Sequence, residues 1–131
     1  MTLVSTPTLY IDGEWCASSN GGHRPTYNPY DASVIMHVDE ATSDDAGRAI
    51  AAAKAFFISS DWSRRSYQYR CALLNRMADS LQKNKAELAR IETIDTGKTL
   101  GESEIDIDDV TNVFRFYATE ALKLAEEKRV T

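Results

Sequence analysis

Long hydrophobic runs are missing from this chain of 131 residues, whose longest purely apolar stretch is Ala49 to Ala53. A membrane-spanning helix needs about 20 apolar residues, so we expect no membrane segment. Met1 to Pro7 contain no basic residue and no apolar core, unlike a secretory signal peptide. The absence of both features predicts a cytoplasmic globular protein.

Basic residues are not in excess. The sequence has 15 Lys and Arg against 20 Asp and Glu, giving a formal net charge of -5. Binding to a nucleic-acid backbone needs a basic face that displaces counterions. We therefore expect no nucleic-acid partner.

Cysteine and histidine are scarce, with two residues of each. Cys16 and Cys71 have neither metal-type nor redox spacing, so we expect buried, reduced thiols of a cytosolic protein. His23 and His37 have no second metal ligand at a suitable spacing, which favours surface or strand-edge positions.

Phosphate-binding motifs are also missing. The sequence contains no Gly-x-Gly-x-x-Gly run. Gly97-Lys98-Thr99 has the ending of a P-loop, but Glu92 stands where that loop needs its first glycine. We therefore expect no cofactor-binding residue in this chain.

The sequence instead contains two kinds of regular pattern within one partial domain, residues 1–131. Residues 8–41 read as antiparallel strands, with Asp12-Gly13 supplying the positive φ angles of a two-residue hairpin turn. Residues 43–127 read as three amphipathic helices. The sequence thus predicts an α+β fragment.

Apolar residues at offsets 0, 3, 4 and 7 mark one face of each expected helix. These positions are Ala46, Ala49, Ile50 and Ala53, then Leu74, Met77, Ala78 and Leu81, then Val110, Val113, Phe114 and Tyr117. We expect the first helix to be capped by Ser43, the second to run from near Ser66 to Gly97, and the third to follow Ser103.

Asp95 is expected to need a compensating partner. It lies in the last turn of a predicted helix, where the negative end of the helix dipole disfavours a carboxylate. Its carboxylate either caps the backbone of Thr96 to Lys98, pairs with Lys98, or binds a cation. Asp106, Asp108 and Asp109 are interpreted as residues that complement the dipole at the start of the third helix.

A set of short motifs occurs in a fixed order, and together they resemble the N-terminal part of the NAD(P)-dependent aldehyde dehydrogenases. The motifs are Leu9-Tyr10-Ile11-Asp12-Gly13-Glu14-Trp15, Asn28-Pro29, Glu92-Thr93-Ile94-Asp95-Thr96-Gly97-Lys98 and Phe114-Arg115-Phe116-Tyr117-Ala118. Within the family they resemble most the betaine-aldehyde and aminoaldehyde members. The resemblance implies the outer helical layer of the cofactor domain, without its Rossmann sheet.

The resemblance also implies which residues carry a function. The nucleophilic cysteine, the general-base glutamate and the cofactor site of the family have no counterpart here, so no catalytic residue is expected. Main-chain oxygens of Thr26 and Tyr27, together with Asp95, match ligands of a monovalent cation such as K⁺. NAD(P) and this cation are expected in an intact family member, and no cofactor in this chain alone.

These implications lead to one functional prediction and two alternatives. We predict a truncated protein resembling aldehyde dehydrogenase, inactive by itself in a family that oxidises aldehydes to carboxylic acids. Residues 119–131, polar and helical, are interpreted as a tail that departs from the family. The alternatives are a helical module that binds a second copy or another protein through exposed apolar faces, and one piece of a split aldehyde dehydrogenase.

Overall fold

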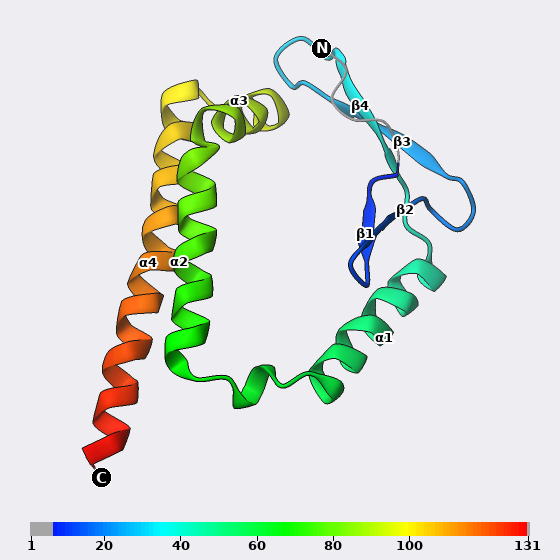
Figure 1. Ribbon diagram of the computed structural model, residues 1–131. Coiled ribbons are helices and arrows are strands. Elements are labelled where there is room, and N and C mark those ends of the chain that lie inside the picture. Colours follow the sequence, from blue (N-terminus) through cyan, green and yellow to red (C-terminus); the bar gives the residue numbers. More distant parts are fainter. Residues whose placement is uncertain (1–6, 131) are drawn as a thin grey trace. The chain divides into compact units, whose positions relative to one another are not determined.

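The computed structural model describes residues 7–130, without the side chains of Ser63 and of residues 125–130. The chain divides into two compact units, Met1–Ser63 and Arg64–Thr131 (Figure 1). The sequence predicts a β region at residues 8–41 and a helical region at residues 43–127. In the structure the first helix belongs to the first unit, where it contacts the first strand.

The strands of the first unit form two antiparallel pairs. Strand β1 (Leu9–Ile11) pairs with β2 (Glu14–Cys16), and β3 (His23–Tyr27) pairs with β4 (Val34–Asp39). Asp12 and Gly13 join β1 to β2 with φ angles of 54° and 86°, which confirms the predicted hairpin turn.

Helix α1 (Ser43–Ser59) completes the first unit. Its N-cap is Thr42, not Ser43 as the sequence suggested. The Thr42 side chain accepts a hydrogen bond from the backbone N–H of Asp45, and the Asp45 carboxylate accepts one from the backbone N–H of Thr42. This reciprocal pair is a capping box, which a lone serine at the next position does not provide.

The second unit consists of three helices, α2 (Tyr67–Lys83), α3 (Lys85–Thr96) and α4 (Leu100–Val130), preceded by the short 3₁₀ helix η1 (Trp62–Arg64). The continuous helix expected from Ser66 to Gly97 is therefore wrong. Asn84 interrupts it with a backbone outside the helical region (φ -102°, ψ 11°). Its backbone N–H and its side-chain amide both donate to the carbonyl of Ser80, which closes the last turn of α2 at this residue.

The turn between α3 and α4 ends one helix and starts the next. Gly97 adopts the left-handed conformation (φ 78°) and donates to the carbonyl of Thr93, as predicted. Helix α4 begins at Leu100, earlier than the sequence suggested, because the Glu102 carboxylate accepts hydrogen bonds from the backbone N–H and the hydroxyl of Thr99. In Figure 1, α2 and α4 lie side by side.

The predicted apolar stripes of the helices coincide only partly with the residues that are buried. Among the described residues the buried apolar ones are Cys71, Ala78, Ala89 and Ala118, all in the second unit. Ala78 belongs to the predicted stripe of α2, whereas α4 buries Ser103, Thr111 and Ala118 and leaves Val113 and Tyr117 exposed. The stripe predicted for α1 is exposed along its whole length.

No helix within residues 7–130 is both long and apolar enough to cross a membrane.

Candidate functional site

Two of the predicted cation ligands lie at the end of β3. Thr26 pairs with Met36 and is half-buried, and its hydroxyl donates to the Met36 carbonyl at 3.4 Å. Tyr27 is exposed and pairs with Val34, after a register shift that falls between Thr26 and Tyr27. The shift disturbs the regular ladder at the two residues whose main-chain oxygens are in question.

The third predicted ligand, Asp95, is exposed in the last turn of α3. Within the described residues its carboxylate has neither a hydrogen bond nor an ion pair. The alternative pairing with Lys98 is not seen, because Lys98 is engaged elsewhere. Asp95 thus remains available to a cation that could compensate for the negative end of the helix dipole.

Lys98 holds the end of α3 to the start of α4. Its Nζ donates to Glu92 Oε1 at 2.8 Å and to Asp106 Oδ2. Hydrogen bonds to Asp106 and then to Glu92 raise the pKa of Lys98 above its ordinary value of 10.5. A second bridge joins Lys85 Nζ to Asp108 Oδ2 at 2.6 Å. Two of the three aspartates assigned to dipole complementation therefore link α4 to residues before it.

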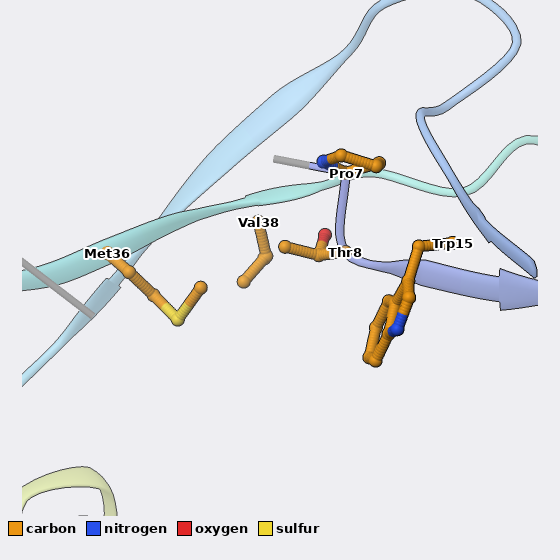
Figure 2. Close-up of a pocket in the computed structure, with 5 residues that line it drawn as sticks. All are labelled: Pro7, Thr8, Trp15, Met36 and Val38. Atoms are coloured by element: carbon orange, nitrogen blue, oxygen red, sulfur yellow. The ribbon is translucent and has the colours of Figure 1, made fainter. Parts of the chain in front are cut away.

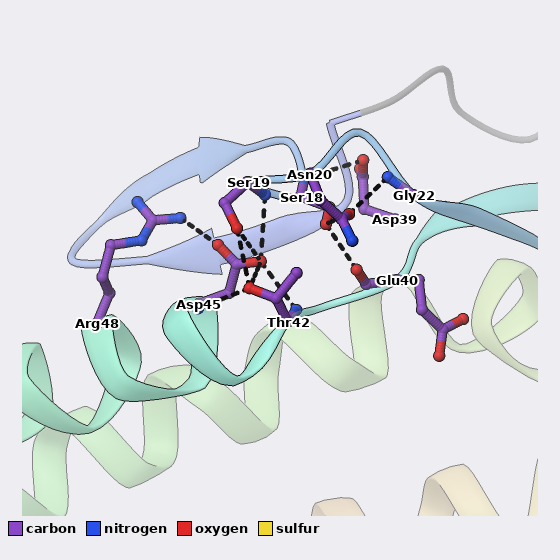
Figure 3. A network of polar contacts seen from close by, with 9 residues as sticks. All are labelled: Ser18, Ser19, Asn20, Gly22, Asp39, Glu40, Thr42, Asp45 and Arg48. Carbon is purple, nitrogen blue, oxygen red and sulfur yellow. Dashed lines mark hydrogen bonds and ion pairs between the residues drawn. The ribbon is translucent and has the colours of Figure 1, made fainter.

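A polar network in the first unit surrounds the carboxylate of Asp45, which is 1% exposed. Figure 3 shows Ser19, Thr42 and Arg48 arranged around it. Arg48 donates at 2.6 Å, and the backbone N–H groups of Thr42 and Ser19 donate at 2.9 and 3.2 Å. These bonds, first that from the Thr42 backbone and then that from Arg48, hold the pKa of Asp45 well below its ordinary value of 3.8.

A second buried carboxylate, Asp39, ties the start of β1 to the end of β4. It accepts from the backbone N–H and hydroxyl of Thr8 at 2.8 and 3.0 Å, and from the backbone of Ser18 at 3.1 Å. His23 Nδ1 lies 3.3 Å away. Burial opposes ionisation of Asp39, but these partners offset it and lower its pKa below 3.8.

An apolar pocket of about 540 Å³ lies beside this carboxylate. Pro7, Thr8, Trp15, Met36 and Val38 line it, and in Figure 2 the side chains of Met36, Val38 and Trp15 face the same space. Apart from the Thr8 hydroxyl, the lining side chains offer no oxygen acceptor and no charge. The pocket therefore suits an apolar group rather than a nucleotide.

The two cysteines differ in their surroundings. Both are free, and Cys71 is buried in α2 with 1% exposure. Cys16 is half-buried and lines a surface pocket together with Arg48. Within residues 7–130 no group of three or more His, Cys, Asp or Glu side chains is arranged to hold a metal ion. A monovalent cation held partly by carbonyl oxygens needs no such group.

The roles of Asp39 and Asp45 and the double bridge of Lys98 were not predicted from the sequence. A signal for Asp45 exists, because Thr42-x-x-Asp45 has the spacing of a capping box. Asp39 has no comparable signal, since its partners Thr8 and Ser18 are 31 and 21 residues away.

Known proteins similar to this chain share one family. The model described as "Aldehyde dehydrogenase family" matches residues 15–131. The chain is 41% identical over 111 residues to the betaine aldehyde dehydrogenase of Bacillus subtilis (strain 168), covering 85% of this chain and 23% of that protein. It is 37% identical to the peroxisomal aminoaldehyde dehydrogenase 2 of Pisum sativum, covering 92% and 25%.

Solved structures agree with these relatives. The betaine aldehyde dehydrogenase of Staphylococcus aureus, determined in complex with NAD⁺, matches with a TM-score of 0.82 and 46% identity, over 84% of this chain and 22% of that one. The chain thus spans about a quarter of the length of its curated relatives. The family match includes residues 119–131, and their departure from the family remains a prediction.

Proposed function

This chain belongs to the aldehyde dehydrogenase family, and we propose on that basis that it supplies the N-terminal β-hairpin and helical segment of an NAD(P)-dependent aldehyde dehydrogenase. The proposed substrates of the assembled enzyme are betaine aldehyde and aminoaldehydes, after the names of the relatives. The observation that carries the proposal is the match of the fold to the S. aureus enzyme at 46% identity.

We further propose that the chain does not oxidise aldehydes alone. The reaction needs a nucleophilic thiolate that an aldehyde can reach, a hydride acceptor and a base. Cys71 is enclosed, and no hydrogen bond joins Cys16 to a histidine or a carboxylate that could act as the base among the described residues. The chain has no glycine-rich dinucleotide motif, and its apolar pocket does not fit NAD(P). Its role is then to position the catalytic parts of the fold.

A chimera tests this function. When the 131-residue chain replaces the matching segment of the S. aureus enzyme, NADH formation with betaine aldehyde should persist. We expect the rate of NADH formation to fall by less than about 100-fold, which is the loss caused by a misplacement of the reacting groups by about 1 Å. The isolated chain, assayed in the same way, should form no NADH above the buffer control.

The proposal fails in either of two ways. A folded chimera that binds NAD⁺ but forms no NADH would show that this segment does not serve the family reaction. Turnover by the isolated chain that survives repurification would show that it is an enzyme by itself.

We propose that Asp95, with main-chain oxygens of Thr26 and Tyr27, contributes to a K⁺ site of the assembled enzyme. The free carboxylate of Asp95 and the register shift at Thr26 support this. In the chimera, Asp95→Asn should abolish any stimulation of NADH formation by KCl over tetramethylammonium chloride. Asp109→Asn, which alters another exposed aspartate, should leave the stimulation unchanged. If KCl stimulates NADH formation equally in both variants, Asp95 is not a ligand of the K⁺ site.

A second candidate function is self-association. Along α4, Val110, Val113, Tyr117 and Leu124 are exposed at spacings of three, four and seven residues, which is the pattern of a helix-pairing seam. Light scattering of the purified chain separates the candidates, because a stable dimer favours the second and a monomer argues against it.

We also propose a cytoplasmic location, supported by the two free cysteines. Relatives include proteins named as peroxisomal and mitochondrial, so fractionation of the source cells provides the test.

A further inference from the structure

The first unit buries polar side chains and leaves its apolar ones outside. Its buried described residues are Ser18, Asp39 and Asp45, and none of the apolar residues among 7–63 is buried. Burial of apolar surface is the main favourable term in folding. The unit therefore buries little apolar surface even for a domain of this size, whose stability is already marginal.

Helix α1 shows this most clearly. We define its apolar stripe as Ala46, Ala49, Ile50, Ala53, Phe56 and Phe57, all of which are exposed. Phe57 is 81% exposed, although burial of a phenylalanine side chain favours the folded state. The only buried residue of α1 is Asp45. In proteins most of the stability of a helix comes from packing of its apolar face, so we expect another surface to cover this stripe.

A groove continues the stripe towards the β1–β2 hairpin. It has a volume of about 510 Å³. Its walls are Ala49, Ala52, Ala53 and Phe56 of α1 and Tyr10, Ile11, Asp12 and Gly13 of the hairpin. The alanines leave room for an incoming side chain, and Phe56 and Tyr10 offer aromatic surface. The groove thus suits an apolar element of protein structure.

The comparisons indicate what covers this face. The S. aureus enzyme has this fold over 22% of its chain, and the other 78% lies outside the matched region. A packed enzyme of that length does not leave a stripe of this kind open to solvent, because exposed apolar patches of soluble proteins are small.

We propose that the apolar stripe of α1 and its groove form the docking face for the remaining three-quarters of an aldehyde dehydrogenase fold, including when that part is a separate polypeptide. The proposal rests on the proposed function. The occupant is the complementary part of this fold rather than a second copy of the chain.

Co-expression tests the proposal. The full chain carries an affinity tag and is produced with the S. aureus enzyme lacking its matching 22%. The unsubstituted chain should co-purify that polypeptide in a one-to-one complex. Ile50→Gln should increase the dissociation rate of the complex about ten-fold, because a buried isoleucine becomes a polar side chain without a partner.

Ile58→Gln is the matched control. Ile50 and Ile58 are the same residue type in the same helix, and both are 70% exposed. Ile58 lies outside the stripe, so its substitution should change the dissociation rate less than two-fold. Glutamine is uncharged, which avoids a different effect of the helix dipole at the two positions. Far-UV circular dichroism of the two variants verifies that α1 is retained.

Each result decides the matter. Failure of the unsubstituted chain to form the complex, or equal effects of the two substitutions, would overturn the proposal. A homodimer of the chain that Ile50→Gln dissociates would assign the stripe to a second copy instead. A complex that forms but makes no NADH would support the docking face while counting against the proposed function. An active chimera, combined with no complex between the two separate polypeptides, would support the proposed function and count against the docking face.

Discussion

Ala78→Asp is expected to unfold most of the second unit. Ala78 is fully buried in α2, which packs along α4, so a carboxylate there enters an apolar contact without a partner. An uncompensated buried charge costs about 3–5 kcal/mol. Since most domains are stable by only about 5–15 kcal/mol, the loss would be a large share of the total.

Far-UV circular dichroism measures this effect through the helices. The helical signal of the variant should fall, and its urea midpoint should shift markedly to lower concentration. Both tryptophans, Trp15 and Trp62, belong to the first unit, so their fluorescence reports on that unit separately.

Ala72→Asp is the control for this substitution. Ala72 is exposed in the same helix, so its aspartate stays in water and should shift the midpoint little. If both variants unfold at the same urea concentration, α2 does not pack through Ala78.

Asp45→Asn is expected to loosen α1 at its start. The carboxylate of Asp45 accepts hydrogen bonds from Arg48, Thr42 and Ser19. Asparagine has the same shape but no charge, and its NH₂ group, itself a hydrogen-bond donor, would face these donors. We expect the melting temperature followed by tryptophan fluorescence to fall by roughly 10 °C, the range for losing a charge-assisted cluster in a unit of this size.

The pH dependence has a definite sign. Because the folded-state pKa of Asp45 is lowered, its stabilisation is fully present above the ordinary value of 3.8 and is lost as pH falls below it towards the folded-state pKa. The unsubstituted chain should therefore lose stability below about pH 4, and Asp45→Asn should show a shallower loss. Asp39, whose pKa is also lowered, contributes in the same direction and remains in both proteins.

Asp44→Asn provides the control. Asp44 is in the same first turn of α1 but is exposed, so it shares the dipole effect without the network. If Asp44→Asn lowers the melting temperature as much as Asp45→Asn, the helix dipole rather than the hydrogen-bond network stabilises this end.

Local features of the fold could be predicted because neighbouring residues decide them. The Asp12-Gly13 turn and the Gly97 cap depend on φ angles that few residue types adopt. The break at Asn84 was missed because the apolar periodicity continues across it, and Asn has only a modest helix penalty. Of the candidate cation site, only the place of Asp95 in the last turn of its helix followed from the sequence pattern, whereas Thr26 and Tyr27 were assigned by resemblance to the family.

By itself the sequence determined the family, the division into strands followed by helices, the Asp12-Gly13 turn and the Gly97 cap, since these depend on residue types and spacings along the chain. Only the tertiary structure decided which helix faces are covered, that Asp39 and Asp45 join segments distant in sequence, and that Lys98 bridges α3 and α4. Periodicity shows that a helix has an apolar face, but burial depends on what packs against it. In α1 that face is complete in sequence and open in the structure.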